Sequence, residues 1–196
     1  MTRKFIHILS FAFLFICAAT AYPAVKPSDV YGWGNLKWGM TGEEIKSAYG
    51  KDIKVHNARE DAKEGLYSDL ELTSATIGGE TFRASLWMDS STKKLAKMVF
   101  VPKGEPEGYA WAETFIKVEE DLSSRYGDPD KEETSNDPGT SAERKWAFPS
   151  TVIELSYLRI EGTELLLLVF SGVITRRLIG TLPRGGSGPV ESEVPA

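Results

Sequence analysis

The sequence predicts an α+β fold in which two helix-plus-three-strand halves pack their helices on one face of an antiparallel sheet. Two amphipathic stretches each end in Ser-x-Tyr-Gly, at residues 47–50 and 124–127, which are 77 residues apart. Three strand-like runs follow each stretch, and the short connections between them favour antiparallel neighbours. We therefore expect one domain whose two similar halves span residues 36–103 and 104–175. A chance likeness of the two halves stays open as an alternative.

The first helix is expected to begin after Thr41. Glu44 stands three residues later, so this pair can form a capping box, in which each side chain accepts a hydrogen bond from the other residue's backbone. Met40 and Ile45 occupy the two positions of a hydrophobic staple. Gly50 suits the left-handed conformation that ends many helices. Both ends of this helix are therefore marked in the sequence.

The second helix is expected over residues 108–126. Its apolar residues recur at spacings of three and four, as in a surface helix that packs one side on a core. Gly127 follows, and Pro129 blocks any continuation. The apolar residues are Trp111, Phe115, Val118, Leu122 and Tyr126.

Six runs of residues have the composition of strands. Gly78-Gly79 and Glu161-Gly162 are two-residue hairpin signals, and residues 89–94 form a longer hairpin loop. The runs of the first half are LYSDLELTSATI, TFRASLWMD and KLAKMVFVP; those of the second half are ERKWAF, TVIELSYLRIEG and TELLLLVFSGVI.

Residues 1–21 have the pattern of a secretory signal peptide. Arg3 and Lys4 precede an apolar run, and an Ala-Thr-Ala cleavage pattern ends at Ala21. A retained membrane anchor is the alternative, but the run is shorter than the roughly 20 residues that span a bilayer. Ile16 precedes Cys17 where a lipoprotein signal needs a small residue. These features predict a periplasmic or secreted protein without stable membrane insertion.

The remaining ends of the chain are expected to carry no packed structure. Residues 22–35 are interrupted by proline and glycine and are expected to be extended. Residues 176–196 are rich in glycine, proline and serine, which predicts a flexible tail. RGGSG at residues 184–188 is followed by Pro189 rather than by a helix, so it does not fit a phosphate-binding loop.

Composition excludes several classes of function. The formal charge of −5 becomes −7 after removal of a leader with two basic and no acidic residues, and such a charge argues against nucleic acid as a partner. Cys17 is the only cysteine and leaves with the leader, so neither a disulfide nor a thiolate nucleophile is expected. His56 is then the only histidine, and we interpret it as a solvated loop residue. No cofactor or metal is expected.

Acidic residues suggest two further sites, and neither is well supported. Residues 128–139, DPDKEETSNDPG, place oxygen atoms at alternate positions, but an EF-hand loop starting at Asp128 requires glycine where the chain has Glu133. A solvated connection is the better interpretation, with another kind of calcium loop left open. Two carboxylates flanking a cleft would suit glycoside hydrolysis, but sequence spacing singles out no pair among 28 acids.

The strand faces give the most informative prediction of a site. In TFRASLWMD one face is apolar, while Arg83 and Trp87 fall on the other. Neither face of TVIELSYLRIEG is cleanly polar, and this run adds Tyr157 and Arg159 to the exposed candidates. If the helices cover only one side of the sheet, these four residues become candidate anchors of a protein-binding surface, because Trp, Tyr and Arg are common there. The alternative is that the N-terminal segment, the tail or a second subunit covers this face.

KWGMTGEEIKSAYG also carries a resemblance. Gly39-Met40-Thr41, then Glu44-Ile45 and Gly50, resembles the first helix of small bacterial envelope domains of the β-lactamase-inhibitor-protein type and of the SmpA/OmlA outer-membrane assembly lipoproteins. The resemblance implies helices on an antiparallel sheet, a periplasmic or secreted location and a binding role. The chain departs from it in lacking a lipobox cysteine, and its second helix begins with Tyr109-Ala110-Trp111.

The sequence thus favours a secreted or periplasmic, non-enzymatic protein-binding domain of the bacterial envelope. Its partner is expected to be a protein of unknown identity, with a homodimer as one possibility. The alternative is a small-ligand carrier or a carboxylate-based hydrolase with a pocket between helices and sheet.

Overall fold

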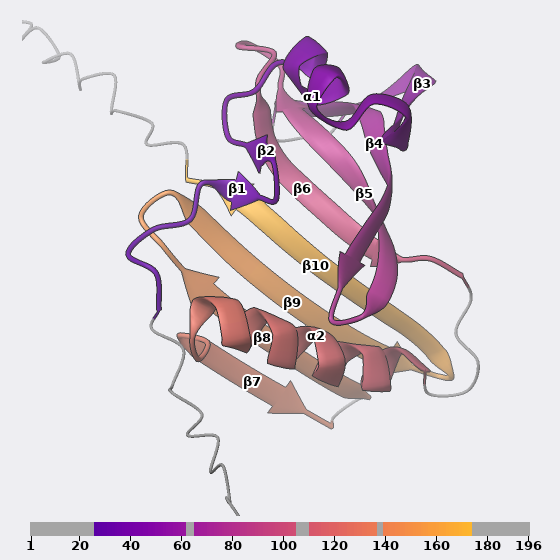
Figure 1. Cartoon of the computed structure of the whole chain (residues 1–196). Helices are drawn as coiled ribbons and strands as arrows, with labels where there is room; N and C mark the ends of the chain where they lie inside the picture. The colour runs from indigo at the N-terminus through magenta and orange to yellow at the C-terminus, as the bar shows by residue number, and fades with distance from the viewer. Residues whose placement is uncertain (1–25, 62–64, 105–109, 137–138, 174–196) are drawn as a thin grey trace, which may run out of the picture.

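One antiparallel sheet of eight strands forms the body of the protein, and two helices with an N-terminal segment pack on it (Figure 1). The computed structural model describes residues 26–61, 65–104, 110–136 and 139–173. The predicted signal peptide, with Cys17, and the predicted tail lie outside these residues. Among the described residues, neither helix has the length and apolar character needed to cross a membrane.

The strand order is β3-β4-β5-β6-β10-β9-β8-β7, so β6 and β10 are neighbours in the centre and β3 and β7 are the edges. A small hairpin of β1 (Gly32–Trp33) and β2 (Leu36–Lys37) precedes the helix α1 (Gly42–Tyr49) and a short 3-10 turn, η1 (Gly50–Asp52). The second helix is α2 (Ala110–Tyr126). The eight strands are β3 (Ile53–Asp61), β4 (Leu66–Ile77), β5 (Glu80–Asp89), β6 (Leu95–Pro102), β7 (Lys131–Ser135), β8 (Thr140–Ala147), β9 (Thr151–Ile160) and β10 (Thr163–Gly172).

The predicted fold class, an α+β arrangement of two helix-plus-three-strand halves, is wrong. The described chain is dominated by a single continuous eight-stranded sheet, and its only two α-helices have 8 and 17 residues. The difference arises from two strands, β3 and β7, whose segments were expected to be loops. β3 contains His56, which is not a loop residue.

Both unpredicted strands are edge strands, which explains why their sequences do not look like strands. The segments are IKVHNARED and KEETS, and nearly all of their side chains are exposed. An edge strand needs only one neighbour's backbone hydrogen bonds, and charged residues on it discourage pairing with other chains. The apolar alternation that marks a central strand is therefore absent from β3 and β7. The segment interpreted as a solvated connection, residues 128–139, contains β7.

The predicted hairpin turns are confirmed. Gly78 and Gly79 have φ of 59° and 78°, and Glu161 and Gly162 have φ of 51° and 83°. Two positive φ values in a two-residue loop match the twist of the flanking strands. Gly78 has a second role, because a Cβ placed there would lie 2.6 Å from the carbonyl oxygen of Lys117 in α2. The β4–β5 hairpin thus rests directly on the helix.

The ends of the first helix are also as predicted. Thr41 Oγ1 accepts a hydrogen bond from the Glu44 backbone N–H at 3.3 Å, and Glu44 Oε2 accepts one from the Thr41 backbone N–H at 2.8 Å. Gly50 has φ of 54°, and Gly127, which follows α2, has φ of 77°. Ile45 of α1 is fully buried.

The core lies on one face of the sheet, which we call the inner face. Alternate residues of each central strand point into it, so that β5 contributes Phe82, Ala84, Leu86 and Met88. The buried residues of both helices belong to the same hydrophobic cluster. In Figure 1, α2 lies across β8 and β9, and β1 lies over β10. Both helices and the N-terminal segment therefore cover the same face.

The N-terminal segment is fixed to the start of β9 by buried and partly buried hydrogen bonds. Asp29 accepts from the backbone N–H of Ser150 at 2.8 Å and from its hydroxyl at 2.7 Å. The fully buried Thr151 donates its hydroxyl to the carbonyl of Val30. Trp38 donates its indole N–H to Thr151 Oγ1 at 2.7 Å. The segment is therefore part of the inner layer and does not lie on the opposite face.

Candidate functional site

The face of the sheet opposite the helices, here called the outer face, is left uncovered by the described residues. On β5 it presents Arg83, Ser85 and Trp87, which alternate with the buried residues of the same strand. On β6 it presents Lys97, Val99 and Val101, which alternate with Met98 and Phe100. None of these six side chains is fully buried. The predicted division of β5 into an apolar and a polar-aromatic face is confirmed.

An apolar strip runs along the centre of the outer face. Leu165 of β10 is 46% exposed and Leu158 of β9 is 38% exposed. In a strand with one solvated face, polar residues on that face alternate with apolar residues on the core face. A run of aliphatic side chains on the exposed face is therefore unusual. We define the central strip as Val99 and Val101 of β6, Leu165, Leu167 and Val169 of β10, and Val152 and Leu158 of β9.

Charged residues flank the central strip with a different sign on each side. Arg83 and Lys97 lie on the β5–β6 side. Glu154 and Glu143 lie on the β9–β8 side, where Lys145 Nζ is 2.7 Å from Glu154 Oε1. The outer face is therefore apolar in the middle, with bases next to the strip on β5 and β6 and mainly acids on β9 and β8; further out on the first side, Glu71 of β4 lies 3.4 Å from His56 Nε2.

Trp87 is the only aromatic side chain on the outer face of β5, and it borders the central strip. It pairs across the sheet with Ser68 of β4 and Lys97 of β6. Its indole Nε1 is buried and has no hydrogen-bond partner among the described residues. A half-buried tryptophan beside a cation has the composition of an interface anchor.

The structure separates the four predicted anchors into two pairs. Arg83 and Trp87 lie together on the outer face of β5. Tyr157 lies on the inner face, where it is 5% exposed, its ring centroid is 6.2 Å from that of Phe115, and its hydroxyl donates to Glu164 at 2.8 Å. Arg159 is two residues further along β9 and so points to the same side as Tyr157. Of the four predicted anchors, only Arg83 and Trp87 lie on the outer face.

Tyr157 and Arg159 were grouped with the others because the sequence of β9 does not reveal its faces. TVIELSYLRI carries large or apolar side chains at both even and odd positions. The residues that sequence reasoning missed are those of the central strip on β6 and β10. Their signal was present in KLAKMVFVP, whose valines alternate with buried methionine and phenylalanine.

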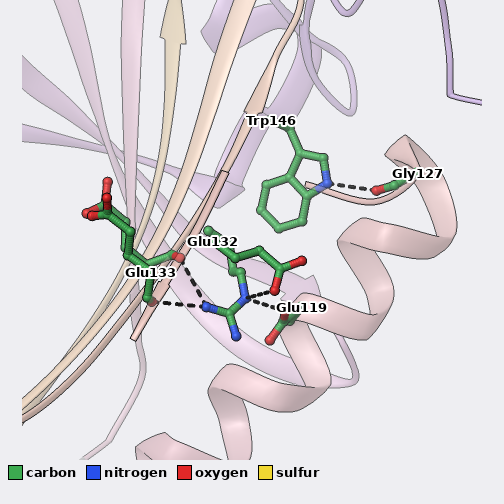
Figure 2. Close-up of polar contacts among 7 residues, drawn as sticks. Glu119, Gly127, Glu132, Glu133 and Trp146 are labelled. Atoms are coloured by element: carbon green, nitrogen blue, oxygen red, sulfur yellow. Dashed lines mark hydrogen bonds and ion pairs between the residues drawn. The ribbon is translucent and has the colours of Figure 1, made fainter. Parts of the chain in front are cut away.

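The main polar cluster beneath α2 is structural. Arg144 of β8 donates through Nε to Glu119 of α2, and Glu132 of β7 lies 3.7 Å away (Figure 2). The same guanidinium donates to the carbonyls of Glu133 and Glu143 at 3.2 and 3.1 Å. It therefore fastens the helix to β7 and β8. Glu119 and Glu132 are thus both engaged by the Arg144 guanidinium.

A second structural contact in the same region fixes the end of α2. Trp146 of β8 is fully buried, and its indole N–H donates to the carbonyl of Gly127 at 2.8 Å (Figure 2). Among the described residues, no three His, Cys, Asp or Glu side chains are grouped as metal ligands.

A cavity of about 370 Å³ lies where the N-terminal segment meets the ends of β6 and β10. Trp38, Leu95 and Ala96 give it a mostly apolar lining. Asp89 also borders it, but its carboxylate accepts hydrogen bonds from the hydroxyls and backbone N–H groups of Ser91 and Thr92. The Ser91 hydroxyl and the further Thr92 and Ser91 donors lower the pKa of Asp89 to about 2. The Asp89 carboxylate is therefore occupied by hydrogen bonds from residues of its own turn.

The chain matches no protein-family model, no curated protein and no solved structure. The class of protein is therefore inferred from the surface itself.

Proposed function

We propose that this chain is a non-enzymatic protein-binding domain, secreted or periplasmic in a bacterial cell envelope, that binds through its outer face. The central strip, with Trp87 and Arg83 beside it, is the single observation that supports this function. Helices and the N-terminal segment are all placed on the other side, so nothing among the described residues covers the strip. The resemblance of the first helix to envelope domains agrees with this location.

The proposal is tested by site-specific photo-crosslinking in a bacterial envelope. A photoreactive amino acid replaces Val99 in the central strip. The matched control replaces Ile116, an apolar residue of α2 that is 55% exposed on the helical side. Adducts at Val99 and none at Ile116 are expected. Absence of any protein adduct at Val99, with the chain folded and exported, would contradict the proposal.

Substitutions at the flank provide a second readout. Trp87→Ala is expected to reduce the yield of the Val99 adduct, because truncation of an interface anchor commonly costs about 2 kcal/mol of binding or more. Lys37→Ala, at an exposed position of β2 on the inner side, is the control. Circular dichroism and thermal melting establish that each variant remains folded.

A small-ligand carrier remains as a second candidate, and the apolar cavity near Trp38 favours it. Cavities of roughly 300 to 1,000 Å³ with apolar walls are typical of ligand sites. Titration with an apolar fluorescent probe should change Trp38 emission, and Ala96→Leu, which fills the cavity, should remove the response. An unchanged response in Ala96→Leu would rule out this site.

A further inference from the structure

We infer that the protein bound by the outer face is a second copy of this chain, stacked face to face with its two-fold axis parallel to the strands and between β6 and β10. This inference rests on the proposed function, because it concerns the same surface. It follows from the way the register of the sheet arranges charge and apolar side chains in rows across the outer face.

One row can be followed strand by strand through the pairing. Glu71 of β4 pairs with Ser85 of β5, which pairs with Val99 of β6, and Val99 pairs with Val169 of β10. Val169 continues the row to Glu154 of β9, and Glu154 pairs with Lys145 of β8. From β4 to β8 the row is therefore acid, hydroxyl, valine, valine, acid, base.

A two-fold axis along the strands reverses the order of the strands in the second copy. Each strand of one copy therefore lies over the strand that is equally far from the axis on the opposite side. β6 then lies over β10, β5 over β9 and β4 over β8. In this row, Val99 meets Val169 of the second copy and Ser85 meets Glu154. Glu71, which lies 3.4 Å from His56 Nε2 in its own chain, meets Lys145. Each contact is made twice because a two-fold interface is isologous. Two valine contacts at the centre and two acid–base contacts on the flanks result.

The neighbouring rows fit the same arrangement. Arg83 lies in register with Val101, and on the other half of the sheet Ser156 lies in register with Glu143. Stacking places Arg83 over Ser156 of the second copy, within a side chain's reach of its Glu143. On the other side of the central row, the row that contains Trp87 and Lys97 also contains Ser171 and Val152. Trp87 therefore stacks on Val152.

The other face-to-face two-fold, with its axis across the strands, is opposed by charge. It places each strand over its own copy, so that in the central row Glu154 meets Glu154, Lys145 meets Lys145 and Glu71 meets Glu71. Like charges brought together at an interface are costly and suppress the wrong geometry. The charges of the outer face therefore select the axis that runs along the strands.

The outer face is large enough for a stable dimer. Six central strands at a spacing of about 4.8 Å, with about eight residues each at about 3.4 Å, cover roughly 29 by 27 Å. That footprint, on the order of 800 Å², equals what one partner buries in a standard interface. Stacked sheets cross at about 30° because each is twisted. The edges of the two sheets therefore diverge, and the like-charged Lys54 of β3 and Lys131 of β7 are kept apart.

A charge-reversal cycle tests the geometry. Lys145→Glu should weaken dimerisation about tenfold or more, measured by sedimentation equilibrium of the purified chain, because it creates two acid–acid contacts. Glu71→Lys combined with Lys145→Glu should restore it. Positions 71 and 145 are five strand spacings, or about 24 Å, apart in one chain, so only a contact between copies can couple them. Lys37→Glu, on β2 at the inner side, is the control for net charge.

Cysteine pairing provides a readout that does not depend on affinity. In a Cys17→Ser background, Ser85→Cys chains mixed with Glu154→Cys chains should form a disulfide-linked dimer on mild oxidation. Either variant alone should not, because its two cysteines are displaced sideways by three strand spacings, or about 14 Å. Equal linking in the mixture and in the single variants would overturn the inferred axis.

Sedimentation and cross-linking together distinguish failure of the dimer from failure of the protein-binding function. A chain that is monomeric in sedimentation, with Val99 cross-linked to a protein of another mass, overturns the dimer and leaves the protein-binding function standing. A monomeric chain without any Val99 adduct overturns both. A dimer whose Lys145→Glu defect is not repaired by Glu71→Lys overturns the stacked geometry.

Discussion

Trp38 and Thr151, which are 113 residues apart, are joined by a 2.7 Å hydrogen bond from the indole N–H to the threonine hydroxyl. The same hydroxyl donates to the carbonyl of Val30, so one buried oxygen serves both sides of the contact. Trp38 also packs over Gly172, where an added Cβ would lie 3.1 Å from its ring. This contact holds the N-terminal segment on the inner face.

Thr151→Val is expected to lower the free energy of unfolding by about 2 to 3 kcal/mol, because the near-isosteric side chain leaves a buried N–H and a buried carbonyl without partners. Urea denaturation measures the change. Thr76→Val, at an exposed position on β4, is the control and should stay within about 0.5 kcal/mol. A loss at Thr151 no larger than that of the control would show that the segment is not fixed by this hydroxyl.

Gly78→Ala and Gly79→Ala should differ although both residues have positive φ. Either alanine costs about 1 to 2 kcal/mol for a left-handed backbone. Gly78→Ala must also displace the α2 backbone, because its Cβ would lie 2.6 Å from the Lys117 oxygen, whereas the space around Gly79 is open. We therefore expect Gly78→Ala to melt at a clearly lower temperature than Gly79→Ala in calorimetry. Equal melting temperatures would mean that the hairpin does not rest on the helix.

Arg144→Met should destabilise the protein by about 2 to 4 kcal/mol, because it leaves Glu119 partly buried without its cation and removes two hydrogen bonds to carbonyls. Lys46→Met, which removes an exposed pair with Glu43 on α1, should cost less than about 1 kcal/mol. Guanidinium denaturation compares them. If the two substitutions cost the same, the Arg144 cluster does not fasten α2 to the sheet.

Acid should destabilise the fold in a range set by its carboxylates. Hydrogen bonds from Ser91 and Thr92 lower the pKa of Asp89 to about 2, and the Lys26 ammonium lowers that of Asp130. A folded pKa below the unfolded value stabilises the protein above the unfolded pKa, near 4, and this contribution is lost as pH falls toward the folded pKa. Stability should therefore decline between about pH 4 and pH 2.

Asp89→Asn isolates the contribution of one carboxylate to this decline. The amide oxygen can still accept hydrogen bonds in the turn, but it cannot titrate. Melting temperatures recorded from pH 6 to pH 2 should fall less steeply for the variant than for the unaltered protein below about pH 4. Identical slopes would indicate that the turn does not hold Asp89 in its charged form.

The parts of the fold that the sequence predicts are those whose side chains meet a core on one side. Strand β5 alternates because Phe82 and Leu86 are buried while Arg83 is not, and α1 carries its capping box at Thr41. β3 and β7 could not be found in this way, because their strand conformation comes from backbone pairing with a neighbour. The sheet order could not be predicted either, since the pairing of β6 with β10 joins segments far apart in the chain.

The candidate surface was predicted only in part, for a related reason. Arg83 and Trp87 were assigned to one face because β5 has a single buried face. Tyr157 and Arg159 could not be assigned, because β9 is central and carries aliphatic residues on both sides. One of those sides is core and the other is the central strip, and side-chain type does not distinguish them. Apolar residues on both faces of a central strand were themselves the sign of the surface.

The charged edge strands also bear on aggregation. A sheet that exposes an aliphatic strip and two unpaired edges offers the elements from which amyloid fibres grow. Along β7 the chain places Lys131, Glu132 and Glu133, and β3 ends in Glu60 and Asp61, so an incoming strand would bury charge at either edge. Sideways growth into a fibril is thereby opposed. The protein can expose the aliphatic central strip because its two edge strands are charged and resist pairing with other chains.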